Sequence, residues 1–230
     1  MSDVMLLCEF EGVLADTRAQ RRRAMKESFA DEGMALPESL YEKYCAGLPV
    51  EAAVEAALSA LGNEKDGALQ TLLALRARRH FASHAASGVT LSRGAATFVE
   101  TAQASARIAL VTRATRREME LMLGLAGLDA AFECVICAED APAPKPSGAP
   151  YTAALERLGR RRGVKRDSVI AIEDTLAGIH AAHDAGVRCI VVGAPPAHQR
   201  SEADAAVDAI AGHSPATLEA LVAQQKRSAA

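Results

Sequence analysis

The stretch that most constrains this 230-residue chain is its first apolar run, Val4–Cys8, together with the polar residues directly after it. Runs of four to eight apolar residues that end in a turn signal are typical of buried strands in a parallel sheet. The run is followed by Glu9 and Glu11 and then by Gly12, which allows the backbone to turn sharply. Residues i and i+2 of a strand share a face, so both carboxylates are expected side by side at the strand's carboxyl end. Open α/β sheets bind ligands at that edge, so the two acids predict a cation site, a proton-transfer pair, or both.

The remainder of the chain changes from a helical to an alternating pattern. After Thr17 the apolar residues recur at helical spacing, and glycines separate four expected helices. From Val89 strand-like runs alternate with helical segments, which is typical of βαβ units with right-handed crossovers. The expected strands cover 108–112, 134–137, 169–172 and 189–192. We therefore expect an α/β fold: a Rossmann-like, mostly parallel sheet formed by 1–16 and 88–230, with a helical cap domain inserted at 17–87.

Composition and charge argue against several classes of partner. A net charge of −3 and a pI near 6.1 provide no basic field for nucleic acid or for an anionic membrane. Arginine clusters at 21–23 and 160–162 are more typical of solvated helix faces. No run approaches the ~18 apolar residues of a membrane span, and the N-terminus lacks the pattern of a secretory leader. A cytoplasmic protein is therefore expected.

Cysteines and histidines give no strong metal signal. Five cysteines, an odd number, agree with a reducing compartment. Cys134 and Cys137 lie in a strand-like run without a second pair to complete a zinc site, so both are expected in the core. Histidines at helical spacing are more typical of helix packing than of a metal site. These are His80 with His84, and His180 with His183.

Reactive side chains lie at or just after the ends of four of the expected strands. They are Glu9 with Glu11, Thr112, Lys145, and Glu173 with Asp174. Phosphoryl transfer needs such a set: a carboxylate nucleophile, a carboxyl to carry the proton, a hydroxyl and an ammonium for phosphate oxygens, and acids for a metal. Singly, each residue has a plainer interpretation, since Thr112 could cap a helix and Glu173 could stabilise a helix dipole. Together, and in this order, they favour a site.

The same motifs resemble those of the haloacid dehalogenase superfamily. Residues 9–17 look like the first motif of its phosphatases, Asp-x-Asp-Gly-x-Leu-x-Asp-Thr, with glutamate at both leading positions. Residues 110–112 resemble the second motif, Asp140 and 145–151 the third, and 172–186 the fourth. The resemblance covers essentially the whole chain. It is to the branch that includes phosphoglycolate phosphatase and β-phosphoglucomutase, whose members carry a helical cap after the first motif.

The resemblance implies catalytic and metal roles. Glu9 stands at the family's nucleophilic aspartate and Glu11 at its acid/base aspartate, while Thr112 and Lys145 stand where the family binds phosphate. The implied cofactor is Mg²⁺, which prefers a few carboxylate oxygens together with water and substrate phosphate. The implied ligands are Glu9, Glu11, Glu173 and Asp174.

The implied substrate is a small phosphorylated metabolite, bound by a monomer or a homodimer. Its expected contacts are Thr112, Lys145, Arg113 and the cap residue Arg21, with Arg18 and Leu48 nearby. The mutases of the branch resemble one another in a histidine where this chain has Arg21, and in a cap arginine near its Leu48. Both departures argue against a sugar-phosphate mutase. Dehalogenase members resemble the chain less, because they lack the second acid and the Glu-Asp motif.

The two glutamates leave two functions open. Glutamate and aspartate differ little in acidity, but a glutamate carboxylate reaches ~1.5 Å farther. In-line transfer depends on placement, and a misplacement of ~1 Å can slow it ~100-fold. One possibility is an Mg²⁺-dependent phosphatase with slow or altered turnover. The alternative is a catalytically impaired pseudophosphatase that keeps a metal and anion site and acts as a sensor or interaction protein.

Overall fold

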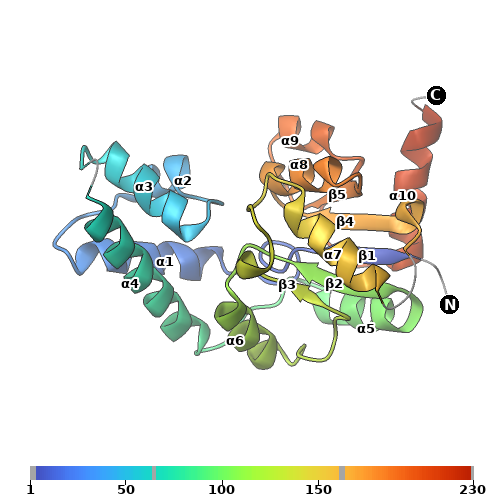
Figure 1. The fold of residues 1–230 in the computed structure, drawn as a ribbon, viewed down its shortest axis with the longest axis horizontal. Helices are drawn as coiled ribbons and strands as arrows, with labels where there is room; N and C mark the ends of the chain where they lie inside the picture. The colour runs from blue at the N-terminus through green and yellow to red at the C-terminus, as the bar shows by residue number, and fades with distance from the viewer. Residues whose placement is uncertain (1–3, 64–65, 161–163, 229–230) are drawn as a thin grey trace. The chain divides into compact units, whose positions relative to one another are not determined.

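The computed structural model describes residues 4–63, 66–160 and 164–228 (Figure 1). Its contacts divide the chain into two compact units. One comprises Met1–Asp16 with Thr90–Ala230, and the other comprises Thr17–Val89, here called the helical unit. Arg161 and Arg162 of the second arginine cluster lie outside the described residues. Across the described ranges, no helix combines the length and the apolar character that crossing a membrane requires.

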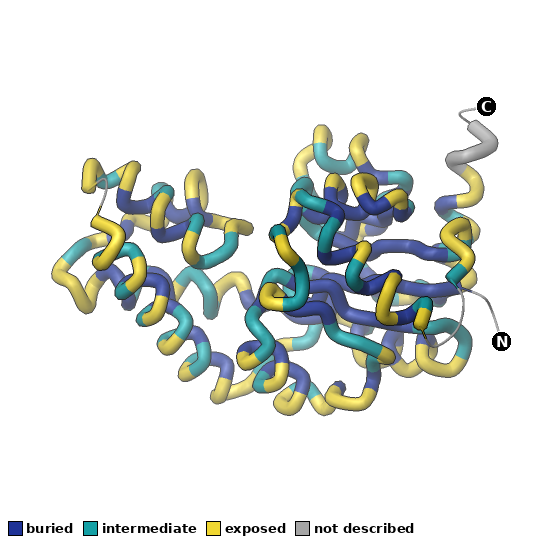
Figure 2. Tube along the Cα trace, in the orientation of Figure 1, coloured by how far each residue is buried: buried dark blue, intermediate teal, exposed yellow. Residues whose placement is uncertain are grey.

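The larger unit is built on a six-stranded parallel sheet, which confirms the predicted α/β fold. The strand order is β3-β2-β1-β4-β5-β6, so the first strand of the chain lies near the middle, between β2 and β4. The strands are β1 (Met5–Cys8), β2 (Arg107–Val111), β3 (Val135–Ile136), β4 (Val169–Glu173), β5 (Arg188–Val192) and β6 (Ala205–Val207). Apart from the first residues of β2 and β5 and one residue each of β3 and β6, all strand residues are buried, as Figure 2 shows.

Helices cover the sheet because its strands are apolar on both faces. One face packs against α7 and α8, where Leu7 and Ala171 share a core with Tyr151 and Ile179. The residues that alternate with these along each strand point to the other face. Among the helices, α5 contacts β2, and α10 contacts β5 and β6. The helices of this unit are α5 (Ala95–Ser105), α6 (Arg116–Ala126), α7 (Ala149–Gly159), α8 (Leu176–Asp184), α9 (Ala197–Glu202) and α10 (Pro215–Ser228), with 3₁₀ turns at Ala138–Asp140 and Arg166–Ser168.

The helical unit contains four helices, close to where the apolar spacing predicts them. They are α1 (Arg18–Ala30), α2 (Glu38–Tyr44), α3 (Val50–Ala60) and α4 (Gly67–Ala85). The buried faces meet in one apolar core that includes Phe29, Leu58 and Leu73. Asp66 caps α4, since its side chain accepts hydrogen bonds from the amides of Ala68 and Leu69 at 3.0 Å each.

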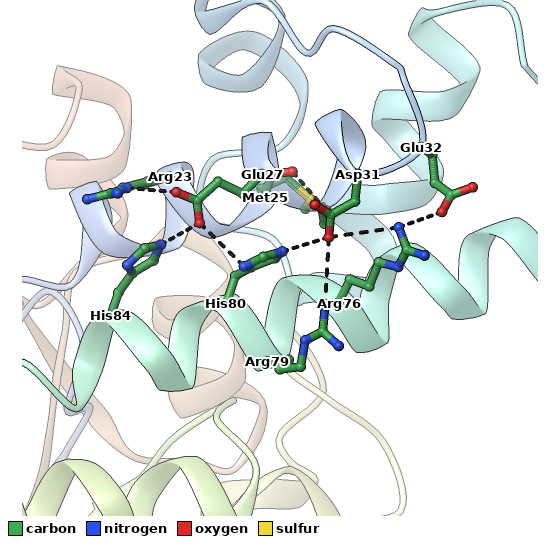
Figure 3. A network of polar contacts seen from close by, with 10 residues as sticks. Arg23, Met25, Glu27, Asp31, Glu32, Arg76, Arg79, His80 and His84 are labelled. Atoms are coloured by element: carbon green, nitrogen blue, oxygen red, sulfur yellow. Dashed lines mark hydrogen bonds and ion pairs between the residues drawn. The ribbon is translucent and has the colours of Figure 1, made fainter.

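A network of polar side chains joins α1 to α4 (Figure 3). His80 Nε2 lies 2.9 Å from Asp31 Oδ2, and His80 Nδ1 lies 3.4 Å from Glu27 Oε2. His84 Nε2 lies 2.6 Å from the same oxygen of Glu27, and Arg23 extends the network at the other oxygen. Two histidines four residues apart on α4 therefore face two acids four residues apart, Glu27 in α1 and Asp31 directly after its end. His80 and His84 serve helix packing, as predicted.

Acid should weaken this pairing of α1 with α4. The hydrogen bond from His80 lowers the pKa of Asp31. Partial burial acts to raise the pKa of Glu27, but its hydrogen bonds to Arg23 and His84 lower it overall. A carboxyl whose pKa is lower in the folded state stabilises the fold at neutral pH, and this contribution is lost as the pH falls through the lowered value.

We therefore expect the melting temperature to fall as the pH drops below 4.5, the ordinary pKa of a glutamate carboxyl group. A variant carrying Glu27→Gln and Asp31→Asn should melt lower than the parent at pH 7 and lose less on acidification. Thermal melts followed by circular dichroism between neutral and acid pH measure both slopes. Parallel slopes in the two proteins would show that the network does not respond to acid in this way.

Candidate active site

The carboxyl edge of the central strands brings two of the predicted acids together. β1 pairs with β4 so that Cys8 lies beside Ile172, and the amide of Glu9 donates to the carbonyl of Ile172 at 2.9 Å. Continuing this register places Glu9 beside Glu173, the last residue of β4. Equivalent residues on neighbouring parallel strands point to the same face, so two carboxylates meet there and require a counter-charge.

Lys145 supplies that counter-charge. Its Nζ donates to Glu9 Oε2 at 2.9 Å, to the carbonyl oxygen of Val111 at 2.7 Å, and to Glu173 Oε1 in a shorter contact. The ammonium is fully buried. Burial alone would lower the pKa of Lys145, but the charges of Glu173 and Glu9 raise it overall, so the group stays protonated. An ammonium has three N–H donors, and these three contacts use all of them.

Glu9 is held on both of its oxygens. Oε2 accepts from Lys145, and Oε1 accepts from the amide of Phe10 at 2.8 Å. The residue is only 3% exposed, although it follows the end of a strand. The carboxyl group is therefore fixed in direction and held at the edge of the sheet where α/β proteins bind ligands.

Glu173 is more fully enclosed than Glu9. The residue is fully buried, and Oε1 accepts a 2.6 Å hydrogen bond from the Tyr151 hydroxyl in addition to the one from Lys145. Oε2 accepts from the amide of Asp174 at 3.3 Å. The carboxyl also lies against the backbone of α8: a Cβ at Gly178 would lie 2.0 Å from Glu173 Cδ. Glu173 thus acts as a buried partner of Lys145 and Tyr151.

Asp174 lies at the edge of the cluster and is half-buried. A Cβ at Gly12 would lie 1.8 Å from Asp174 Oδ2, so this carboxylate sits directly over the turn that follows β1. Burial, and then the charges of Glu173 and Glu9, raise the pKa of Asp174 to about 7, against the opposing effect of Arg113 and Lys145.

The other predicted residues lie in different surroundings. Thr112 directly follows β2 and is buried, and its Oγ1 accepts from the amide of Ala114 at 3.2 Å. Arg113 is half-buried and close enough to affect the pKa of Asp174. Arg21 belongs to the helical unit, where its guanidinium lies 3.5 Å from the centre of the Phe81 ring. The substrate contacts predicted for Arg21 and Arg113 stay predictions.

Glu11 corrects one step of the sequence argument. We expected a continuous strand to set Glu9 and Glu11 side by side, but β1 ends at Cys8. The carbonyl of Phe10 accepts from the amides of Leu14 and Ala15 at 2.8 and 2.9 Å, so the chain already turns there. Glu11 lies within this turn, and the alternation of a strand does not extend to it. Its predicted acid/base role stays a prediction.

The loop that carries Lys145 is anchored at both ends. Before it, Asp140 accepts from the amide of Cys137 at 2.8 Å and forms ion pairs with Arg116 and Arg157. After it, the amide of Gly148 donates to Asp184 Oδ2 at 2.7 Å. Anchors on both sides keep the ammonium between the two strand ends, which is the preorganisation that catalysis requires.

A divalent metal fits the chemistry of these donors in part. In the described part of the chain, no group of three or more His, Cys, Asp or Glu side chains is arranged to hold a metal ion. Glu9 and Glu173 bond to Lys145 instead. Even so, the hard carboxylate oxygens gathered here are the kind of ligand that Mg²⁺ prefers. The predicted four-residue magnesium set stays a prediction.

Tyr151 is the site residue that the sequence argument left without a role. It stood only as the end of the third motif, and no spacing rule connects it to Glu173. The one available signal was an aromatic residue with a polar group on an otherwise apolar helix face, since a buried tyrosine hydroxyl usually has a hydrogen-bond partner.

Comparisons with known proteins identify the family of this chain. CbbY from Cereibacter sphaeroides is 30% identical over 211 residues, which cover 88% of this chain and 89% of that protein, and CbbY from Rhodobacter capsulatus is 28% identical over 88% and 90%. The crystal structure of a CbbY variant from Rhodobacter sphaeroides in complex with xylulose 1,5-bisphosphate has a TM-score of 0.77 and 26% identity, covering 93% of this chain and 98% of that one. Residues 6–192 match the model of the haloacid dehalogenase-like hydrolases, and because this match spans most of the chain, the protein belongs to that family.

Proposed function

We propose that this protein is an Mg²⁺-dependent phosphatase for a small phosphorylated metabolite, of the class of sugar phosphates. One observation carries the proposal: the Glu9 carboxylate is held between Lys145 and the Phe10 amide at the carboxyl edge of the central strands. The relative crystallised with a sugar bisphosphate supports the substrate class. Thr112, Lys145 and Asp174 support phosphate ester hydrolysis, because they stand where the family resemblance implies contacts with phosphate and metal.

In the proposed reaction Glu9 attacks the phosphorus atom, and the bond from phosphorus to the alcohol oxygen breaks. The alcohol leaves with a proton from Glu11, and the phosphoryl group stays on Glu9 as an acyl phosphate. Water then attacks this intermediate while Glu11 takes up its proton, which releases inorganic phosphate and restores Glu9. Lys145 and the Thr112 hydroxyl stabilise the charge on the phosphate oxygens.

Magnesium, when bound, would offset the negative charge of the phosphate beside these acids. Glu9 and Asp174 are the ligands that the donor chemistry favours, with Glu11 and Glu173 implied by the family resemblance. Glu173 is fully buried and supports the site through its hydrogen bonds with Lys145 and Tyr151. Arg113 and Arg21 are the proposed contacts for the remainder of the substrate.

A second function is favoured by the burial of Glu9. Both of its oxygens are engaged and the residue is 3% exposed, so attack on a phosphate requires this carboxylate to become accessible. A protein in which that step fails would still bind an anion and a cation here. It would act as a sensor or interaction protein.

Replacing the proposed nucleophile separates the two functions. We expect Mg²⁺-dependent hydrolysis of an aryl phosphate by the parent, and a loss of ~10³-fold or more in kcat for Glu9→Gln, the scale seen when a nucleophile is removed. The conservative variant with Glu9→Asp and Glu11→Asp should remain active. Glu156→Gln, an exposed change on α7, is the matched control and should keep parental activity.

The same assay shows which function is wrong. Activity that persists in Glu9→Gln would rule out the covalent route through this residue. An inactive parent together with an active double aspartate variant would instead establish the binding protein, because only the length of the two side chains differs between them.

A further inference from the structure

We propose that Tyr151 is a positioning residue that allows Lys145 to exchange Glu173 for a phosphate oxygen, an inference that rests on the phosphate-binding part of the proposed function. Tyr151 lies on α7 and is fully buried, with its ring centre 5.2 Å from Lys145 Nζ. Its hydroxyl donates to Glu173 Oε1, the same oxygen that Lys145 contacts. It therefore acts on the site only through other side chains.

Lys145 as it stands has no N–H to offer a phosphate. Its three donors are taken up by Glu9, Val111 and Glu173, and an ammonium has no fourth. A phosphate oxygen that binds Lys145 must therefore displace one of the three acceptors. Which acceptor can be released depends on what remains bonded to it afterwards, because a buried acceptor without a donor is strongly unfavourable.

Glu173 is the acceptor that can be released. Once Lys145 turns away, Oε1 still accepts from the Tyr151 hydroxyl and Oε2 still accepts from the amide of Asp174. Both oxygens of this fully buried carboxylate thus remain satisfied. Without the tyrosine hydroxyl, Lys145 would be the last described donor to Oε1. Turning Lys145 away would then leave this buried oxygen without a donor, so Lys145 would be held on Glu173.

Tyr151→Phe tests this exchange, because it removes the hydroxyl and keeps the ring. With inorganic phosphate as the probe and Mg²⁺ present, titration calorimetry should show binding ~10-fold weaker than in the parent, the scale of one hydrogen bond to a charged group. KM for an aryl phosphate should rise by a similar factor with a smaller change in kcat. Tyr41→Phe, which removes the hydroxyl of a buried tyrosine in the helical unit, should leave phosphate affinity unchanged.

A second pair of variants, built on Glu173→Gln, tests the inference even if Tyr151→Phe destabilises the protein. In Glu173→Gln the charge that holds Lys145 is gone, so adding Tyr151→Phe should weaken phosphate binding by less than threefold, on the logic of a double-mutant cycle. An undiminished effect in that background, parental affinity in Tyr151→Phe, or a parent that binds no phosphate would each overturn the inference. A parent that binds phosphate but hydrolyses no ester refutes only the proposed turnover, since the affinity measurements still judge the exchange.

Discussion

Lys145→Met is expected to lower the free energy of unfolding by about 3–5 kcal/mol, the range for removing one partner of a buried ion pair. The change keeps most of the apolar stem and removes only the ammonium. Glu9 and Glu173 would then lie at the sheet edge with no cation between them, and Glu173 is fully buried. Urea denaturation followed by circular dichroism measures the loss, and phosphate binding should disappear with it.

Two variants show whether the loss comes from the buried charges. Lys145→Met combined with Glu173→Gln removes one cation and one anion, so it should recover a large part of the stability but none of the phosphate binding. Lys26→Met removes a lysine from an exposed ion pair with Glu38 and should change stability by no more than about 1 kcal/mol. If Lys145→Met unfolded within that margin of the parent, the ammonium could not be the group that balances the two acids.

The sheet was largely predictable because its strands are short apolar runs closed by turn signals. The segments expected at 108–112, 169–172 and 189–192 appear as β2, β4 and β5 with ends shifted by one residue. β6 was missed, because Ala205–Val207 is three residues long and two of them are alanine, which has little preference for strands. The six-residue α9 was missed because it is too short to show a helical period.

Three of the predicted site residues, Glu9, Lys145 and Glu173, meet in the structure, but the hydrogen bonds among them could not be predicted from the sequence. Strand order explains why Glu9, Lys145 and Glu173 meet, since parallel strands bring their carboxyl ends to one edge. Nothing in the spacing says that the lysine would take up both acids, because that depends on the loop fixed by Asp140 and Asp184. Long-range side-chain geometry of this kind is set by the folded chain, in which Lys145 lies within hydrogen-bonding distance of both acids.

Gly178→Ala should destabilise the protein by about 3 kcal/mol, at the upper end of what overpacking a core costs. The added Cβ would lie 2.0 Å from the Cδ of Glu173 and from its Oε2, so the carboxyl would have to move. It has nowhere to go without breaking its bonds to Lys145 and Tyr151. The change should therefore also weaken phosphate binding, which calorimetry with inorganic phosphate would detect beside the shift in urea midpoint.

The same substitution at Gly159 should act in the opposite direction. This glycine ends α7, and an added Cβ would come no closer than 3.8 Å to Val164 Cγ2, an ordinary contact. Alanine favours a helix over glycine, so a gain of up to about 1 kcal/mol is expected. The two substitutions thus change the stability in opposite directions. The Glu173 carboxyl occupies the space that a Cβ at Gly178 would need, whereas a Cβ at Gly159 makes only an ordinary contact. If Gly178→Ala were also neutral or stabilising, Glu173 would be free to move, and its role as the fixed partner of Lys145 would be wrong.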